Sequence, residues 1–111
     1  MMELEQLRIF LAVVEHGGFR AAAAALYISH STTCRHVAAL EETLGVPLFR
    51  RLGRTLQLTP AGEILFRESK DLLGRAEETV RAVRRAGERA EEETLPGALK
   101  QDPEDPEKRG K

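Results

Sequence analysis

The segment that decides the fold runs from Ser29 to Leu40 and reads SHSTTCRHVAAL. It follows the small apolar segment Phe19 to Leu26 after a spacer of only two residues. Two short helices joined by so tight a turn are typical of a helix-turn-helix, in which the first helix supports the second. The second segment carries hydroxyl, thiol and guanidinium groups, whose size and chemistry suit the major groove of DNA. The pattern therefore predicts a helix-turn-helix over about residues 19–38.

The two faces of the second helix can be assigned by counting 100° per residue. Ser29 is a natural N-cap, so we expect the helix to begin directly after it. At steps of four, three and four, the stripe expected to be buried contains Thr33, Val37, Leu40 and Leu44. The opposite face holds Ser31, Arg35, Ala38 and Glu42, flanked by Thr32 and Cys34. This opposite face is the candidate groove-binding surface.

An amphipathic helix precedes this pair. Its apolar residues are Leu4, Leu7, Phe10, Leu11 and Val14, which share one face at helical spacing. The pair Gly17-Gly18 ends it, because glycine adopts the left-handed conformation at little cost. The next helix, Phe19 to Leu26, is rich in alanine, so another helix can approach its backbone closely.

After Pro47 the apolar period changes from 3.6 to about two, which indicates a short β-hairpin. Its strands are predicted at Leu48–Arg51 and Thr55–Leu58, with a turn over Leu52-Gly53-Arg54. Alternation along a strand turns Arg50 and Arg51 to opposite faces. Flexible cations on such a wing can reach phosphates or a narrow minor groove. The candidate DNA-binding residues are therefore His30, Ser31, Thr32, Cys34, Arg35, Arg50, Arg51 and Arg54.

A long helix is predicted from Pro60 to about Thr94, with Thr59 as its cap and proline at its first position. Apolar residues at heptad-like spacing form a stripe along this helix. A helix of roughly 45 Å is too long for the whole stripe to be buried against so small a head. A second copy of the chain is the simplest partner for this stripe. The predicted dimerisation residues are Phe66, Leu73, Ala76, Val80 and Val83.

Composition and charge set further bounds. The chain has 111 residues and a net charge of −1, but residues 20–62 hold five arginines against two glutamates, a local charge of +3. Screening over roughly 8 to 10 Å makes the local positive charge more important for phosphate binding than the charge of a distant acidic tail.

We expect a head over residues 2–59, a linker helix over 60–94 and a disordered acidic tail over 95–111. With no apolar run long enough for a bilayer, no leader pattern and Cys34 as the single cysteine, we expect a cytoplasmic protein that contacts no membrane.

Catalysis and metal binding find little support in the sequence. His16, His30 and His36 lack a paired carboxylate at useful spacing, and no nucleophile motif or phosphate-binding glycine loop occurs. His30 and Cys34 stand four residues apart, but two ligands do not build a tetrahedral site, so no metal or cofactor is predicted. Cys34 remains open to two interpretations, a redox-sensitive thiol near a helix N-terminus or a serine-like space filler.

The segment Leu4 to Gly62 resembles the winged helix-turn-helix head of LysR-type transcriptional regulators. The first two helices match the family in L-x-x-L-x-x-F from Leu4 and in G-F-x-x-A-A-x-x-L from Gly18. The stretches LGVPLFxR from Leu44 and LTPAG from Leu58 resemble the two most characteristic parts of the family. The following helix resembles the family's dimerising linker helix. The resemblance predicts a mainly α fold, a winged helix-turn-helix of three helices and a hairpin, followed by a long dimerisation helix.

The resemblance also implies a function. The recognition helix would enter the major groove of double-stranded DNA, the wing would contact the backbone or minor groove, and a homodimer would bind a dyad-symmetric promoter site. An alternative is an interaction protein that forms heterodimers with full-length regulators and antagonises them. The family carries a ligand-binding domain after the linker; none is expected before Lys111, so no small-molecule effector is assigned.

Several residues depart from the family pattern. His30-Ser31 stands where the family has Gln-Pro, Cys34 replaces a common serine and His36 a common glutamine. These changes predict a different base preference. Thr33 occupies an inward position that is aliphatic in the family, so its hydroxyl must find a carbonyl partner or the helix packs less well.

Overall fold

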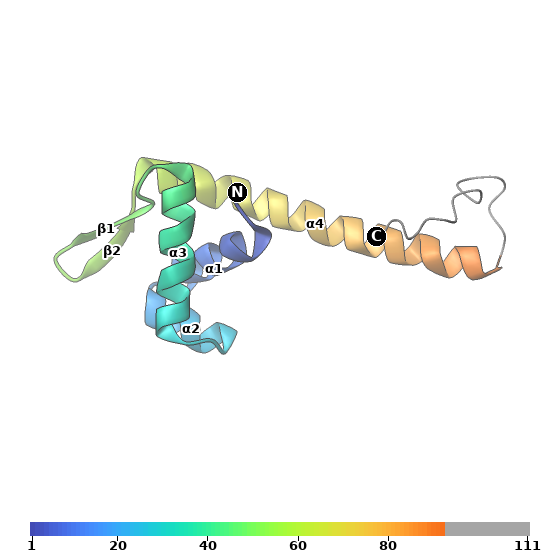
Figure 1. The fold of residues 1–111 in the computed structure, drawn as a ribbon, viewed down its shortest axis with the longest axis horizontal. Helices are drawn as coiled ribbons and strands as arrows, with labels where there is room; N and C mark the ends of the chain where they lie inside the picture. Colours follow the sequence, from blue (N-terminus) through green and yellow to red (C-terminus); the bar gives the residue numbers. More distant parts are fainter. Residues whose placement is uncertain (93–111) are drawn as a thin grey trace. The chain divides into compact units, whose positions relative to one another are not determined.

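The structure is a computed structural model that describes residues 1–92, with side chains described to residue 90. It contains four helices and one two-stranded hairpin, and so confirms the predicted fold class (Figure 1). Residues 1–77 form one compact unit, and a second unit begins at Glu78, within the last helix. In chain order the elements are α1 (Leu4–His16), α2 (Phe19–Leu26), α3 (His30–Leu44), β1 (Phe49–Leu52), β2 (Thr55–Leu58) and α4 (Pro60–Glu92).

Helix α1 forms the centre of the head, because apolar side chains on it face two neighbouring groups of residues. On one side Leu7 and Phe10 pack with Leu40 of α3 and Leu73 of α4. On another side its residues pack against α2 and α3; this cluster contains Ile9, Ala12, Val13, Ala22 and Val37. The helix ends as predicted, with Gly17 in the left-handed conformation at φ 83°.

Helices α2 and α3 begin and end close to the predicted residues. The turn between them places Tyr27 in the left-handed conformation at φ 59°. Ser29 caps α3, since its Oγ accepts a hydrogen bond from the backbone N–H of Thr32 at 3.0 Å. Helix α3 continues to Leu44 and ends at Gly45, which is left-handed at φ 76°. Its N–H donates to the carbonyl of Glu41, as the N–H of Gly17 does to the carbonyl of Val13.

The hairpin pairs β1 with β2 in antiparallel register, from Phe49 opposite Leu58 to Leu52 opposite Thr55. Its turn is one residue shorter than predicted, because Leu52 belongs to the strand. Leu56 and Leu58 are half-buried while Thr55 and Gln57 are exposed, which confirms the predicted alternation along β2.

The start of α4 is joined to the loop before β1 through Thr59, whose N–H donates to the carbonyl of Leu48 at 2.9 Å. Thr59 is buried, and its hydroxyl donates to the carbonyl of Pro47 at 2.7 Å and accepts from the N–H of Gly62 at 3.0 Å. The threonine therefore caps the helix and ties it to the loop before β1. At Gly62 the backbone lies so close to this loop that a Cβ atom would overlap the carbonyl oxygen of Leu48.

The first turns of α4 belong to the head, which corrects the sequence analysis on one point. The exposed fraction of Leu73 is 7%, because it packs in the cluster with Leu7 and Phe10, and Phe66 is half-buried against the same cluster. Leu73 therefore already has apolar partners within its own chain, and its place in the dimer interface, like that of Phe66 and Ala76, stays a prediction. The compact unit extends to residue 77 rather than ending at 59.

The rest of the predicted seam has a different environment. Val80 and Val83 lie in the second unit with exposed fractions of 47% and 64%. Their place in a dimer interface stays a prediction, and the predicted acidic tail over 95–111 lies outside the described residues. Among residues 1–92 no single helix is long and apolar enough to span a bilayer; α1 and α2 reach that length and composition only together, across a 118° bend.

The close approach at Gly62 generates a test of this packing. Gly62→Ala should lower the free energy of unfolding by about 1 to 3 kcal/mol, because the added methyl group must displace the loop at Leu48. Gly74→Ala is the matched control: a Cβ there meets nothing within 4 Å, so the same change should raise stability by about 1 kcal/mol through helix propensity. Urea unfolding followed by circular dichroism measures both. If the Gly62→Ala protein were as stable as the Gly74→Ala protein, the close approach of α4 to the loop at Leu48 would be contradicted.

Candidate nucleic-acid interface

The orientation of α3 about its own axis is set by three buried side chains. Thr33, Val37 and Leu40 have exposed fractions of 0%, 3% and 0%. The Thr33 hydroxyl, which required a partner, donates to the carbonyl of Ser29 at 3.0 Å, so the departure from an aliphatic residue leaves no unsatisfied group there. Val37 and Leu40 pack against α1 and Thr33 is buried on the same side, so the opposite side of α3 must face outward.

That outward face agrees with the sequence prediction. Ser31, Arg35, Ala38 and Glu42 are all exposed, and Thr32 and Cys34 at its edge are half-buried. The predicted burial of Leu44 is wrong, because this residue, at the last turn of α3, has an exposed fraction of 38%. The head does not extend far enough to cover this turn, so Leu44 borders an apolar groove instead.

Hydrogen bonds order the first turns of α3. The Ser29 hydroxyl donates to Thr32 Oγ1 at 2.8 Å, and Arg35 Nη2 donates to the same oxygen at 3.4 Å. The Arg35 guanidinium thus lies along the outward face near the helix N-terminus. Recognition helices contact base edges mainly with residues of their N-terminal turns, so Ser31, Thr32 and Arg35 occupy the positions that such a helix uses.

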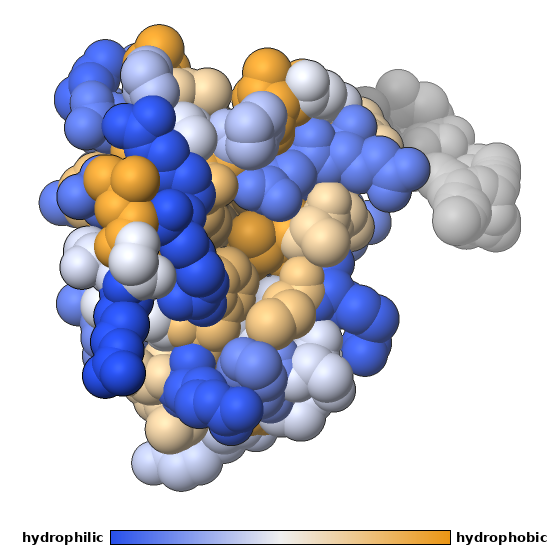
Figure 2. Space-filling model, turned by 90° about the vertical axis from the view of Figure 1, so that its left-hand side faces the viewer, coloured by the Kyte–Doolittle hydropathy of each residue, from blue (hydrophilic) through white to orange (hydrophobic). Residues whose placement is uncertain are grey.

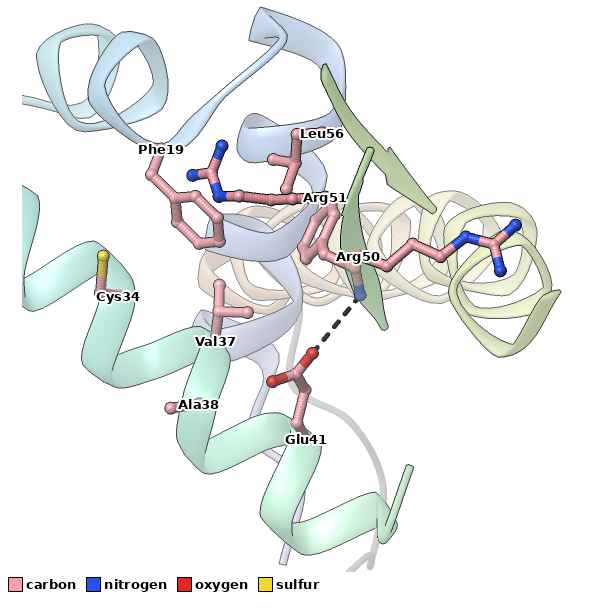
Figure 3. A pocket seen from close by; sticks show the side chains of 9 residues that line it. Phe19, Cys34, Val37, Ala38, Glu41, Arg50, Arg51 and Leu56 are labelled. Carbon is pink, nitrogen blue, oxygen red and sulfur yellow. Dashed lines mark hydrogen bonds between the residues drawn. The ribbon is translucent and has the colours of Figure 1, made fainter. Parts of the chain in front are cut away.

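The arginines of the hairpin point in different directions. Figure 3 shows the Arg51 side chain extending toward Phe19 of α2, whereas the Arg50 side chain extends in the opposite direction, as the strand alternation predicted. The hollow between α3 and the hairpin has a volume of about 310 Å³. Its lining residues are Phe19, Cys34, Val37, Ala38, Glu41, Phe49, Arg50, Arg51 and Leu56.

A second hollow brings in a cation that the sequence analysis missed. Arg20 lines it together with His30 and Arg51, beside the glycines that precede α2. The uncapped N-terminus of α2 lies at the same place, since Gly18 has no side chain to bond the first N–H groups. The only signal in the sequence is the position of Arg20 in the first turn of the supporting helix; the fold is needed to place it near Arg51.

Among the residues that the structure describes, the basic side chains of this surface have no carboxylate partners. None of the ion pairs within residues 1–92 involves Arg20, Arg35 or the three hairpin arginines. On the face shown in Figure 2, hydrophilic side chains border a narrower area of apolar ones. Unpaired guanidinium groups around a shallow hollow can bind phosphate oxygens, which are the dominant partners in protein–DNA interfaces.

Cys34 and His30 lie close together on α3, with Cys34 Sγ 3.6 Å from His30 Nε2. Among the described residues no group of three His, Cys, Asp or Glu side chains lies close enough to hold a metal ion. Cys34 is half-buried at the edge of the hollow, so its thiol also fills space between α3 and the hairpin.

The geometry defines a class of protein. A helix-turn-helix whose second helix presents an exposed polar face, followed by a two-stranded wing with unpaired arginines, is a winged helix-turn-helix domain. Comparison of the sequence with known families agrees: residues 4–63 match the model for "Bacterial regulatory helix-turn-helix protein, lysR family". The chain belongs to the LysR family of DNA-binding transcriptional regulators, which is not a family of enzymes.

Relatives of known sequence support this assignment. Over 80 residues the chain is 44% identical to a probable RuBisCO transcriptional regulator of Cyanidioschyzon merolae, covering 72% of this chain and 26% of the relative. It is 42% identical over 86 residues to a probable cat1 operon transcriptional activator of Acinetobacter lwoffii, covering 78% of this chain and 28% of the relative. The chain thus corresponds to about a quarter of the length of these regulators.

Solved structures show the same arrangement of elements. The BenM DNA-binding domain in complex with catB site 1 DNA matches with a TM-score of 0.74 and 36% identity, covering 78% of this chain and 97% of that one. The CbnR DNA-binding domain in complex with DNA matches with a TM-score of 0.73 and 37% identity, covering 78% and 99%.

The cap of α3 can be tested by its effect on stability. Ser29→Ala should lower the free energy of unfolding by about 1 kcal/mol, because the Thr32 N–H loses its acceptor. Thr43→Ala removes a hydroxyl from an exposed position of the same helix and should raise stability by about 0.5 kcal/mol, because alanine has the higher helix propensity. Chemical denaturation of the two variants under the same conditions makes the comparison. Equal stabilities would mean that Ser29 does not cap the helix.

Proposed function

We propose that this protein is a sequence-specific regulator that binds a dyad-symmetric promoter site as a homodimer, in the cytoplasm. In each copy α3 lies in the major groove and the hairpin lies along the backbone or in the adjacent minor groove. The proposed DNA-contacting residues of α3 are His30, Ser31, Thr32, Cys34 and Arg35. Those outside α3 are Arg50, Arg51, Arg54 and, from the structure, Arg20.

One observation carries this proposal: the cations that flank the outward face of α3 have no carboxylate partners within residues 1–92, while the opposite face of the helix is buried. The buried face fixes how the helix can dock. Small side chains at Ser31 and Cys34 allow the helix axis to approach the base edges closely. The complexes of BenM and CbnR DNA-binding domains with DNA support the same use of this fold.

Exposed apolar side chains support the proposed dimer. Val80 and Val83 are exposed in the second unit, and the head has an apolar groove of about 270 Å³ beside α4. Leu44, Val46, Ile64 and Leu65 line this groove together with Leu48, Ala61 and Glu68. Since Leu73 is already buried, we assign the head's share of the interface to Ile64 and to Leu72, which have exposed fractions of 54% and 44%. Burying such surfaces against a second copy would remove them from water.

Two arginines should affect DNA binding in different ways. Arg35→Ala should cost roughly 1 to 3 kcal/mol at the preferred site and relax sequence preference, because a base contact is lost. Arg51→Ala should weaken binding to all duplexes alike and reduce the slope of log affinity against log salt by about one, because a phosphate contact is lost. Titrations of a selected and a random duplex at several salt concentrations measure both effects.

The proposed docking mode would be wrong if both arginine variants bound as tightly as the unchanged protein. A chain that forms dimers but binds no duplex even at low salt would instead favour an interaction protein that pairs with other regulators.

The dimer is tested by placing a charge in its proposed interface. Val80→Lys should shift the protein from dimer toward monomer and weaken DNA binding, because the lysine cannot be buried without a partner for its charge. Glu78→Lys introduces the same side chain two residues away, about 200° round the helix, and should leave the dimer intact. Sedimentation equilibrium over a range of concentrations gives the two dissociation constants. A Val80→Lys protein that dimerises like Glu78→Lys would place the interface elsewhere.

A further inference from the structure

Glu41 stands out because it is an acidic residue inside a surface that must attract phosphates. It lies on α3 one turn after Val37, is half-buried, and lines the hollow between α3 and the hairpin. By charge alone a carboxylate at this place opposes binding to a polyanion. Its neighbour Glu42 has the same charge but is exposed on the outward face of the same helix. The two residues therefore have the same charge but different contacts.

The contacts of Glu41 are with the backbone at the base of the hairpin. Its Oε2 atom accepts a hydrogen bond from the N–H of Leu48 at 2.7 Å and a longer one from the N–H of Phe49 at 3.4 Å. Figure 3 shows this carboxylate reaching from α3 toward β1. A charged acceptor on two successive N–H groups is among the stronger kinds of hydrogen bond in proteins. The bond spans from the recognition helix to the first residue of the wing.

The hairpin depends on such attachments. Two strands of four residues are marginally stable alone, so the direction of the wing is set by what holds its base. The Phe49 ring packs against Phe10 and Phe19 at centroid distances of 5.4 and 5.5 Å, and Thr59 holds the other end of the hairpin to Pro47. Among these attachments, the Glu41 bond is the polar one that originates on α3.

We propose that Glu41 is a positioning residue: it fixes the hairpin at a set distance and angle from α3, so that Arg50 and Arg51 meet the DNA backbone while α3 lies in the groove. Arg50 and Arg51 follow directly after the two N–H groups that the carboxylate holds. Glu41 itself contacts no DNA in this arrangement. The inference rests on the proposed docking mode, in which α3 and the wing bind one duplex together.

The test uses the full chain and the duplexes that the unchanged protein selects from a random library. Glu41→Ala should weaken binding on the order of tenfold, because the wing arginines lose their fixed positions. Glu42→Ala, the matched control, removes the same charge from the outward face and should tighten binding, because the repulsion between this carboxylate and the phosphates is removed. Glu41→Gln keeps an oxygen acceptor and should stay within about twofold of the unchanged protein. Glu41→Asp keeps the charge but is one methylene shorter, so it should weaken binding as alanine does.

Double-mutant cycles separate positioning from general stability. In the Glu41→Ala background, Arg51→Ala should cost clearly less affinity than it does in the unchanged protein, because the arginine is no longer well placed. Arg35→Ala should cost the same in both backgrounds, because α3 keeps its own packing. A role limited to folding would change both costs alike. If the Glu41→Ala protein does not fold, the same two cycles with Glu41→Asp decide the question.

The inference is overturned if Glu41→Ala and Glu42→Ala have the same effect on binding, or if the Glu41 variants couple to Arg35 as strongly as to Arg51. If neither Arg35→Ala nor Arg51→Ala changes binding in the unchanged protein, the docking mode itself fails. The two failures are therefore distinguishable.

Discussion

The burial of Thr33, Val37 and Leu40 on the inner side of α3 is the constraint on which the surface depends. These three side chains are almost completely removed from water, and turning α3 by even a third of a turn would expose them. Because the helix cannot rotate, the opposite face is held outward without any direct support of its own. The hydrogen bond from Thr33 to the Ser29 carbonyl makes a polar residue compatible with this buried position. Recognition is thus placed by packing on the far side of the helix.

Helix α4 shows how one apolar pattern can serve two kinds of burial. Apolar periodicity predicts only which side chains are buried, and it does not distinguish burial in a core from burial in a dimer interface. Phe66 and Leu73 continue the same stripe as Val80, yet Leu73 is buried in the head while Val80 is exposed. Ser69, between Phe66 and Leu73 in the sequence, is completely buried, and its hydroxyl has no hydrogen-bond partner among the described residues. The helix is therefore part of the head's core at its start and carries exposed apolar side chains further along.

The wing is held in place by polar and aromatic contacts at its base rather than by the pairing of its own strands. Thr59 and Glu41 attach it on two sides, and the Phe49 ring attaches it to α1 and α2. Residues that are far apart in the sequence meet here: Glu41 and Leu48 are separated by seven positions, Pro47 and Thr59 by twelve. No periodicity or propensity reports such contacts, because they depend on how separate elements pack.

The sequence alone determined the order of the elements, the outward face of α3 and the alternation in the hairpin, because these follow from local periodicity, caps and turn residues. It also indicated the family through the stretches from Leu44 and Leu58. Only the tertiary structure decided which apolar residues of α4 are core, that Leu44 is exposed, and that Arg20 lies near Arg51. The physical reason is that burial and proximity depend on the path of the whole chain, whereas a residue's own neighbours in sequence set only its local conformation.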